Sequence, residues 1–198
     1  MAAARFRKIL IGLTAVLGLL IAAPAAHAEE ESPGCPGDVL ERPFAPWGDG
    51  MSYTLAPDGD FTGGGAGWAL DGAEIVDDNE PWYVHGGATP AALSLERGDS
   101  ATTPPICVTP LHPTMRFFAR SAGGVLETLK VEVVLGGGVS LPIGVLAALT
   151  QGDEWAPTPV LPIVANLLDD EVRFRFTAIG IGSAWVVDDV YVDPYGKG

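Results

Sequence analysis

The stretch Val172–Ala178, which reads VRFRFTA, decides the fold class. Apolar and polar side chains alternate along it. Because successive side chains of a β-strand point to opposite faces, all the apolar side chains of this stretch point the same way. The sequence therefore predicts a strand with one face in the core and with Arg173, Arg175 and Thr177 on its outer face.

Two further stretches alternate in the same way. The outward side chains are Arg116, Phe118 and Arg120 in Met115–Arg120, and Lys130, Glu132 and Val134 in Leu129–Leu135. If these two strands and Val172–Ala178 are neighbours, they form one cationic, partly aromatic sheet face that could hold a ligand. The alternative is that these Arg and Lys side chains pair with acids across strands, which is common and adds little stability.

Short runs rich in Val, Ile, Leu, Phe, Trp and Thr lie between frequent Gly and Pro residues, a pattern typical of all-β proteins. The predicted strands are Ser52–Leu55, Trp68–Val76, Ala91–Leu95, Pro105–Thr109, Thr114–Arg120, Thr128–Leu135, Leu141–Leu149, Val160–Leu168, Glu171–Ile179 and Ala184–Val192. The Leu141–Leu149 run could instead form a buried helical turn. We expect an all-β fold, a two-sheet antiparallel β-sandwich.

The first 28 residues have the pattern of a cleavable export signal. Arg5, Arg7 and Lys8 precede an uncharged apolar run, Ile9–Ala23, and the sequence Ala-His-Ala ends at Ala28. A single membrane anchor is the alternative, but the apolar run is shorter than the roughly 20 residues of a spanning helix. We therefore expect residues 1–28 to be removed, 29–46 to form an N-terminal segment, and 47–198 to form the sandwich domain.

Charge restricts the partners of the exported chain. Removal of residues 1–28 leaves eight basic residues against 25 acidic ones, a net charge of −17. Nucleic acids and anionic membranes bind clustered cations, so neither is an expected partner. We expect a secreted, extracellular, monomeric protein with no membrane span after signal cleavage.

The two cysteines, Cys35 and Cys107, both lie in the part that would be exported. An even cysteine count in an oxidising compartment is most simply a disulfide. A redox or metal pair is the alternative, but the spacing is not that of a Cys-x-x-Cys motif. The predicted disulfide joins the N-terminal segment to the sandwich.

The run Ala184–Asp193, which reads AWVVDDVYVD, resembles the closing strand of galactose-binding-like jelly rolls, a family that includes many carbohydrate-binding modules. Leu40–Phe44 and Gly67–Leu70 are similar to the opening strand and the Trp-containing second strand of that family. The use of Ala, Gly and Pro also resembles that of secreted proteins from high-GC bacteria. The resemblance implies a β-sandwich of the jelly-roll type.

The same resemblance implies a structural calcium ion, held by an acid on the opening strand and an acid of the closing Asp-Asp pair. Glu41 and Asp188 are the matching residues, although Glu41 lacks the usual Asn-x-Gly-Phe-Glu context. Strict alternation puts Asp188 on the same face as Val186, Val190 and Val192. An inward carboxylate must be paired, hydrogen-bonded or bound to a metal, so backbone donors are the alternative to calcium.

Aromatic side chains in loops are the other candidate ligand-binding groups. Trp47, Trp82 and Trp155 lie in loops rich in Gly, Pro or acids, Tyr83 follows Trp82, and these rings could stack on a sugar. Loop aromatics also often cap the ends of a sandwich. Trp68 is predicted to lie in the core, and Trp185 at an edge or on the second face.

No arrangement of residues predicts catalysis. His85 and His112 are not at metal-ligand spacing, and no Gly-x-Ser-x-Gly elbow occurs. The acid clusters at Asp77–Glu80, Asp153–Glu154 and Asp169–Glu171 are interpreted as solvated loop acids, although a hydrolase could use two of them. The sequence thus favours a non-catalytic protein that binds a carbohydrate or cell-envelope component; the alternative is a structural or protein-interaction domain without a small ligand.

Overall fold

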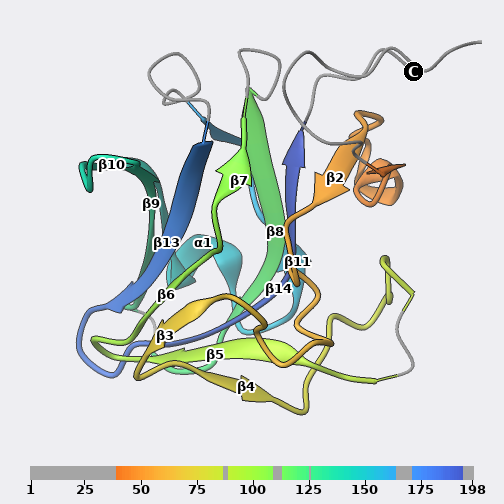
Figure 1. Ribbon diagram of the computed structural model, residues 1–198. Helices are drawn as coiled ribbons and strands as arrows, with labels where there is room; N and C mark the ends of the chain where they lie inside the picture. Colours follow the sequence, from red (N-terminus) through yellow and green to blue (C-terminus); the bar gives the residue numbers. More distant parts are fainter. Residues whose placement is uncertain (1–38, 87–88, 109–112, 125, 164–170, 194–198) are drawn as a thin grey trace, which may run out of the picture. The chain divides into compact units, whose positions relative to one another are not determined.

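Two antiparallel sheets pack against each other in the computed structural model, which describes residues 39–86, 89–108, 113–124, 126–163 and 171–193 (Figure 1). These residues belong to one compact unit that spans residues 31–198. The predicted all-β, two-sheet sandwich of the jelly-roll type is confirmed.

The first sheet, called the β14 sheet, has eight strands in the described residues. Its order is β1 (Leu40–Glu41), β2 (Tyr53–Leu55), β14 (Ala184–Asp193), β5 (Ala92–Glu96) and β4 (Glu74–Val76), with β8 (Thr114–Ser121) beside β14, and with β11 (Ala156–Pro157) and β12 (Leu161–Pro162) beside β8. The longest pairing in this sheet is that of β8 with β14.

The second sheet, called the β13 sheet, has six strands in the same part of the chain. Its order is β10 (Ser140–Ala147), β9 (Thr128–Leu135), β13 (Glu171–Ile179), β6 (Ser100–Thr102) and β3 (Ala69–Asp71), with β7 (Ile106–Cys107) also paired to β13. Two short helices complete the described elements, η1 (Ala45–Trp47) and α1 (Ala148–Gln151). No helix among the described residues is long and apolar enough to cross a membrane.

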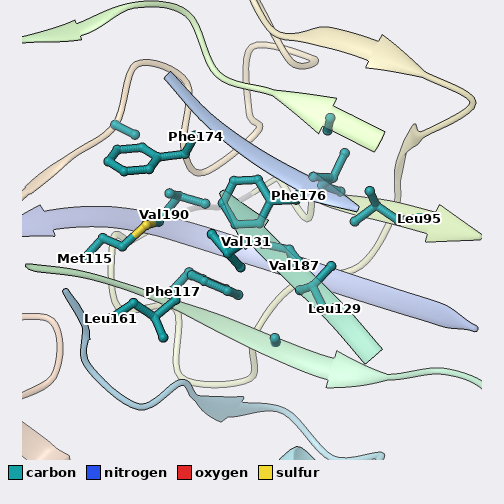
Figure 2. Packing of buried hydrophobic residues seen from close by; sticks show 14 of the residues in the cluster. Leu95, Met115, Phe117, Leu129, Val131, Leu161, Phe174, Phe176, Val187 and Val190 are labelled. Atoms are coloured by element: carbon teal, nitrogen blue, oxygen red, sulfur yellow. The ribbon is translucent and has the colours of Figure 1, made fainter. Parts of the chain in front are cut away.

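The main core lies between the sheets (Figure 2). Phe117 of β8 meets Phe176 of β13 edge to face, with ring centroids 5.2 Å apart, and Trp68 stacks on Phe176 at 5.9 Å. Both geometries are favourable for aromatic pairs. The predicted inner faces of β8, β9 and β13 are confirmed, and so is the core position of Trp68.

Most predicted strands lie where the sequence placed them, and the differences have local causes. Trp68–Val76 is split into β3 and β4, because Gly72 takes a left-handed backbone conformation with φ of +78°. Leu141–Leu149 is a strand as far as Ala147 and then turns into α1. Of the predicted Val160–Leu168 strand only β12 is seen, and residues 164–168 lie outside the described residues.

The strict alternation predicted for β14 is wrong, because a β-bulge interrupts the strand. Its pairing with β8 shifts register between Asp188 and Tyr191, and Asp189 has φ of +49°. A bulge adds one residue and reverses the side-chain parity beyond it. Trp185 therefore faces the main core before the bulge, and Val190 faces it after the bulge.

A second hydrophobic cluster covers the outer face of the β14 sheet. Phe44, Tyr53, Phe118 and Tyr191 are almost completely buried there. Phe44 comes from the segment that leads into η1, and its ring stacks on Phe118 with centroids 5.3 Å apart. Phe118 thus points outward from β8 as predicted, yet it is shielded from solvent by the N-terminal part of the domain.

The condition for a single cationic face is not met, because β8 is not a neighbour of β9 and β13. Arg116 and Arg120 lie on β8 in one sheet, whereas Arg173 and Arg175 lie on β13 in the other. Because the main core separates the two sheets, outward side chains of β8 and β13 project from opposite faces of the sandwich. A ligand on one face cannot contact both pairs of arginines.

Several sequence-based expectations fall on residues outside the described part of the chain. They concern the export signal at residues 1–28, His112, and Asp169 and Asp170 of the third acid cluster. Cys107 lies on β7, but Cys35 is not among the described residues. The disulfide between them therefore stays a prediction.

Candidate functional site

The loop between β4 and β5 presents two neighbouring aromatic rings to solvent. Trp82 is 45% exposed and Tyr83 is 49% exposed, which is unusual for side chains of this size. Tyr83 also has φ of +50°, a backbone conformation that few non-glycine residues adopt. Strained backbone of this kind is often found at ligand-binding sites, so this loop is the first candidate.

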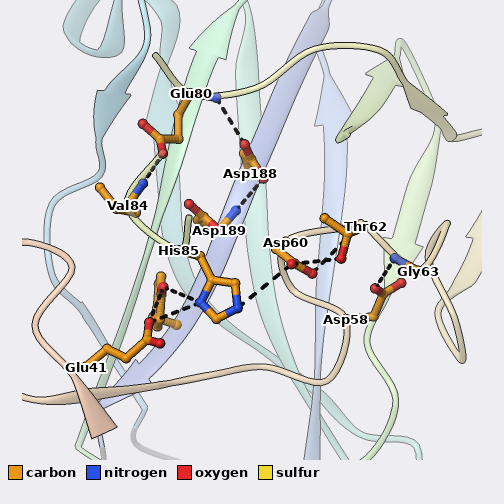
Figure 3. A network of polar contacts seen from close by, with 11 residues as sticks. Glu41, Asp58, Asp60, Thr62, Gly63, Glu80, Val84, His85, Asp188 and Asp189 are labelled. Atoms are coloured by element: carbon orange, nitrogen blue, oxygen red, sulfur yellow. Dashed lines mark hydrogen bonds and ion pairs between the residues drawn. The ribbon is translucent and has the colours of Figure 1, made fainter. Parts of the chain in front are cut away.

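Buried Glu80 holds the loop in place from below (Figure 3). Its carboxylate accepts hydrogen bonds from the backbone N–H of Trp82 at 2.6 Å and of Val84 at 2.5 Å. Its own backbone N–H donates to Asp188 Oδ2 at 3.0 Å. These hydrogen bonds fix the backbone of the loop, so the two rings are displayed from a preorganised loop.

The inner side of the Trp82 ring packs on other aromatic rings. Its centroid lies 4.8 Å from that of Trp47 and 5.6 Å from that of Phe118. Trp155 is only partly exposed, and the Arg120 guanidinium lies 5.6 Å from its ring centroid. We call Trp47, Trp82, Tyr83 and Trp155 the aromatic patch. It lies over the outer face of β8.

The two arginines of β8 make ion pairs with acidic side chains of the domain itself. Arg116 is buried, its Nη1 atom binds Asp49 Oδ2 at 2.7 Å, and its Nε atom donates to the Thr158 carbonyl at 2.9 Å. Burial alone would raise the pKa of Asp49, but hydrogen bonds from Tyr53 and Arg116 bring it below its ordinary value. The Nη2 atom of Arg120 binds Asp78 at 2.5 Å. On β8 the arginines therefore pair with acids, as in the alternative to a cationic ligand-binding face.

A polar network links the same loop to β1 and β14 (Figure 3). His85 Nδ1 lies 3.1 Å from Glu41 Oε2, which also accepts a hydrogen bond from the Tyr191 hydroxyl at 2.8 Å. His85 Nε2 lies 3.9 Å from Asp60 Oδ2. Burial would lower the pKa of His85, but Glu41, Asp60 and Asp189 outweigh it and raise the pKa above its ordinary value.

Two buried carboxyl groups of the β14 bulge lie beside this network. Burial is the main cause that raises the pKa of Asp188 to about 7 and that of Asp189 to about 8, and the charges on neighbouring acids add to it. Asp188 accepts hydrogen bonds from the backbone N–H groups of Glu80 and Asp189. Asp188 is therefore held by backbone donors, the alternative that the sequence left open.

The predicted calcium ligands do not form a ready metal site. Glu41 binds His85 and Tyr191, while Asp188 binds backbone N–H groups of the β4–β5 loop and the bulge. Within the described ranges, no group of three or more His, Cys, Asp or Glu side chains is arranged to hold a metal ion. The calcium ion that the resemblance implied still stays a prediction.

The two arginines of β13 lie on the other face of the sandwich. Arg173 is exposed, and Arg175 lines a groove of about 470 Å³ on the outer face of the β13 sheet. The groove is lined mainly by polar side chains, among them Asp71, Ser100, Thr102 and Lys130. Groove and aromatic patch are therefore separate candidates.

The sequence missed the role of Glu80. The sequence predicts that Glu80 is a solvated loop acid, but its side chain is fully buried. Asp153 and Glu154 are exposed, as predicted. Nothing in the local pattern distinguishes a loop acid that caps backbone N–H groups from one that faces water. Only the loop geometry shows the difference.

Comparison with known proteins supports the fold. No family model matches the sequence, and no curated protein matches it. Among solved structures, a family 61 carbohydrate-binding module in complex with β-1,4-galactotriose aligns with a TM-score of 0.50 and 16% identity, over 70% of this chain and 96% of that module. A family 11 carbohydrate-binding module of a Clostridium thermocellum cellulase aligns with a TM-score of 0.48 and 13% identity, over 72% of this chain and 95% of that module.

Carbohydrate-binding modules thus occur among the structural neighbours of this domain. At 16% identity the likeness to the family 61 module shows the fold alone, a jelly-roll β-sandwich. Because one fold hosts many functions, the function has to be argued from the site.

Proposed function

We propose that this domain is exported and binds a carbohydrate without catalysing a reaction, through the rings of Trp82 and Tyr83. The observation that carries the proposal is the exposure of these two adjacent rings on a loop that buried Glu80 holds from below. The carbohydrate-binding modules among the structural neighbours support the same class of ligand.

The physical argument concerns the cost of binding. A sugar ring has an apolar face that packs on an aromatic ring, and large rings supply contact area while losing little conformational freedom. Trp82 is already packed against Trp47 and Phe118 on its inner side, so little side-chain entropy is left to lose. Preorganisation of this kind increases affinity without new contacts.

The alternative is a structural or protein-interaction domain without a small ligand. It predicts that Trp82 and Trp155 are packed down and that the arginines are paired. The partly buried Trp155 and the ion pairs of Arg116 and Arg120 agree with it. The exposure of Trp82 and Tyr83 does not, and it favours the carbohydrate-binding function.

The test is titration of the purified domain with β-1,4-galactotriose, cellotriose and then a panel of polysaccharides, followed by tryptophan fluorescence. We expect one glycan to change the emission. Trp82→Ala should weaken its binding by about tenfold or more, whereas Trp82→Phe, which keeps an aromatic face, should weaken it less.

Leu126→Ala is the matched control, because Leu126 is also exposed but is not part of the aromatic patch. Thermal unfolding of each variant shows that it is folded. If every glycan leaves the emission unchanged, or if Trp82→Ala binds as tightly as the parent, the proposed sugar contact of Trp82 is wrong and the protein-interaction function is preferred.

A further inference from the structure

The groove on the outer face of the β13 sheet is a second candidate ligand site. Its floor is formed by cross-strand rows of side chains: Arg175 lies between Thr102 of β6 and Glu132 of β9, and Thr177 lies between Ser100 and Lys130. These hydroxyl, amino and carboxylate groups line an open groove of about 470 Å³. Polar groups in such rows can bind the hydroxyls of an extended sugar chain.

Arg175 has no carboxylate partner among the described residues, because the acid opposite it binds another side chain. Glu132 lies directly opposite on β9, but its carboxylate binds Lys130 Nζ at 3.0 Å. In the described part of the chain, the Arg175 guanidinium contacts only two hydroxyl groups, Thr102 Oγ1 at 3.3 Å and Ser140 Oγ at 3.5 Å. Both contacts are long for hydrogen bonds.

The composition of the chain makes this arrangement informative. Acidic residues outnumber basic ones by 25 to 11, so carboxylates are abundant on the surface. The two arginines of β8 each bind one. Arg175 instead lines a groove, and its guanidinium is a planar fork of N–H donors that matches the two oxygens of a carboxylate.

We propose that this groove binds a polysaccharide that carries carboxylate groups, with Arg175 receiving the carboxylate of a uronic acid unit and the flanking hydroxyl side chains contacting neighbouring sugar hydroxyls. The ligand class rests on the proposed carbohydrate-binding function. The site does not, because it lies on the opposite face of the sandwich from Trp82.

The net negative charge of the chain does not prevent this binding. At physiological salt, charges separated by more than about 8 Å are largely screened, so the nearest groups decide the local interaction. Of the two acids that line the groove, Glu132 is paired with Lys130, and Asp71 is the other. Arg175 is the basic side chain of the groove that no described carboxylate binds.

The test is calorimetric titration of the whole domain with trigalacturonate, with its methyl ester, and with β-1,4-galactotriose. Arg175→Gln removes the charge but keeps hydrogen-bond donors. Arg173→Gln is the matched control, because Arg173 lies on the same strand and face but does not line the groove. We expect Arg175→Gln to weaken trigalacturonate binding by about tenfold and Arg173→Gln to leave it within about twofold.

The methyl ester should bind the parent no better than trigalacturonate binds Arg175→Gln. The inference is overturned if acid and ester bind equally, if Arg175→Gln binds as the parent does, or if trigalacturonate does not bind at millimolar concentration. Trp82→Ala separates the two proposals, since it should reduce glycan binding at the aromatic patch and leave the effect of Arg175 on trigalacturonate unchanged.

Discussion

At the scale of single residues, the buried acids around the β4–β5 loop set the properties of the candidate site. Glu80 holds the backbone that presents Trp82, and Asp188 holds the backbone of Glu80 in turn. Asp189 is buried beside them, in the left-handed conformation of the bulge. Burial raises the pKa of Asp188 and of Asp189, so this part of the domain should respond to pH.

We predict that the domain becomes less stable as the pH rises from 5 to 9. Asp188 and Asp189 have folded-state pKa values of about 7 and about 8, against an ordinary value of 3.8, so the folded chain holds more protons in between. Their stabilising contribution is complete below the ordinary pKa and is lost progressively as the pH rises from there through the folded-state values. His85, whose pKa is also raised, acts in the same direction.

Urea unfolding at pH 5 and pH 9 measures this effect. The parent should lose at least about 1 kcal/mol of unfolding free energy, and Asp189→Asn should lose clearly less. Asp77→Asn, a change at an exposed acid of the same loop, should behave as the parent does. A parent whose stability is constant or rises over this range would contradict the prediction.

At the scale of elements, the bulge of β14 connects the sandwich to the β2–β3 loop. The carbonyl of Val190 accepts a hydrogen bond from Ala56 N at 2.8 Å, and the N–H of Val190 donates to Gly59 O at 3.0 Å. These bonds replace the ladder pairing that the bulge interrupts. They also bring the backbone of Gly59 very close to β14.

We predict that Gly59→Ala destabilises the domain by about 1–3 kcal/mol. A Cβ atom on Gly59 would lie 2.8 Å from the Val190 carbonyl oxygen and 3.0 Å from that of Ala56, and both are backbone atoms that cannot turn away. Gly137→Ala is the control, because no atom lies within 4 Å of its added Cβ. Equal unfolding midpoints for the two variants would show that the β2–β3 loop moves freely from β14.

At the scale of the whole molecule, the N-terminal part of the chain covers the outer face of the β14 sheet. Phe44 is buried against Phe118 and Tyr191, and the Arg116 guanidinium lies 4.4 Å from the Phe44 ring centroid. At its N-terminal end this cover begins with β1, which has only two residues and pairs with β2. A covalent link from residue 35 to β7 would strengthen that attachment.

We predict that reduction of the domain lowers its unfolding free energy by about 4 kcal/mol, the value for a disulfide that closes a long loop. Unfolding with and without reductant measures the change, and mass spectrometry after alkylation shows whether Cys35 and Cys107 are linked. The double variant Cys35→Ser/Cys107→Ser should be as unstable as the reduced parent and insensitive to reductant. If the oxidised protein reacts with alkylating agent at both cysteines, the disulfide is wrong.

The sequence by itself determined the fold class, most strands and the inner faces of β8, β9 and β13. Alternation with period two is a local property, and a buried face imposes it on each strand separately. The sequence also singled out Trp82, Tyr83 and Arg175, because large aromatic rings in loops and outward arginines are visible in the chain itself.

Which of these groups are available to a ligand depends on the tertiary structure. Strand order put the arginines of β8 and β13 on opposite faces, and the bulge at Asp189 let Val190 face the same core as Trp185. The Phe44 ring packs on Phe118, and Asp49 binds Arg116. No carboxylate among the described residues binds Arg175. These outcomes depend on contacts between residues far apart in the chain, and local periodicity carries no information about such contacts.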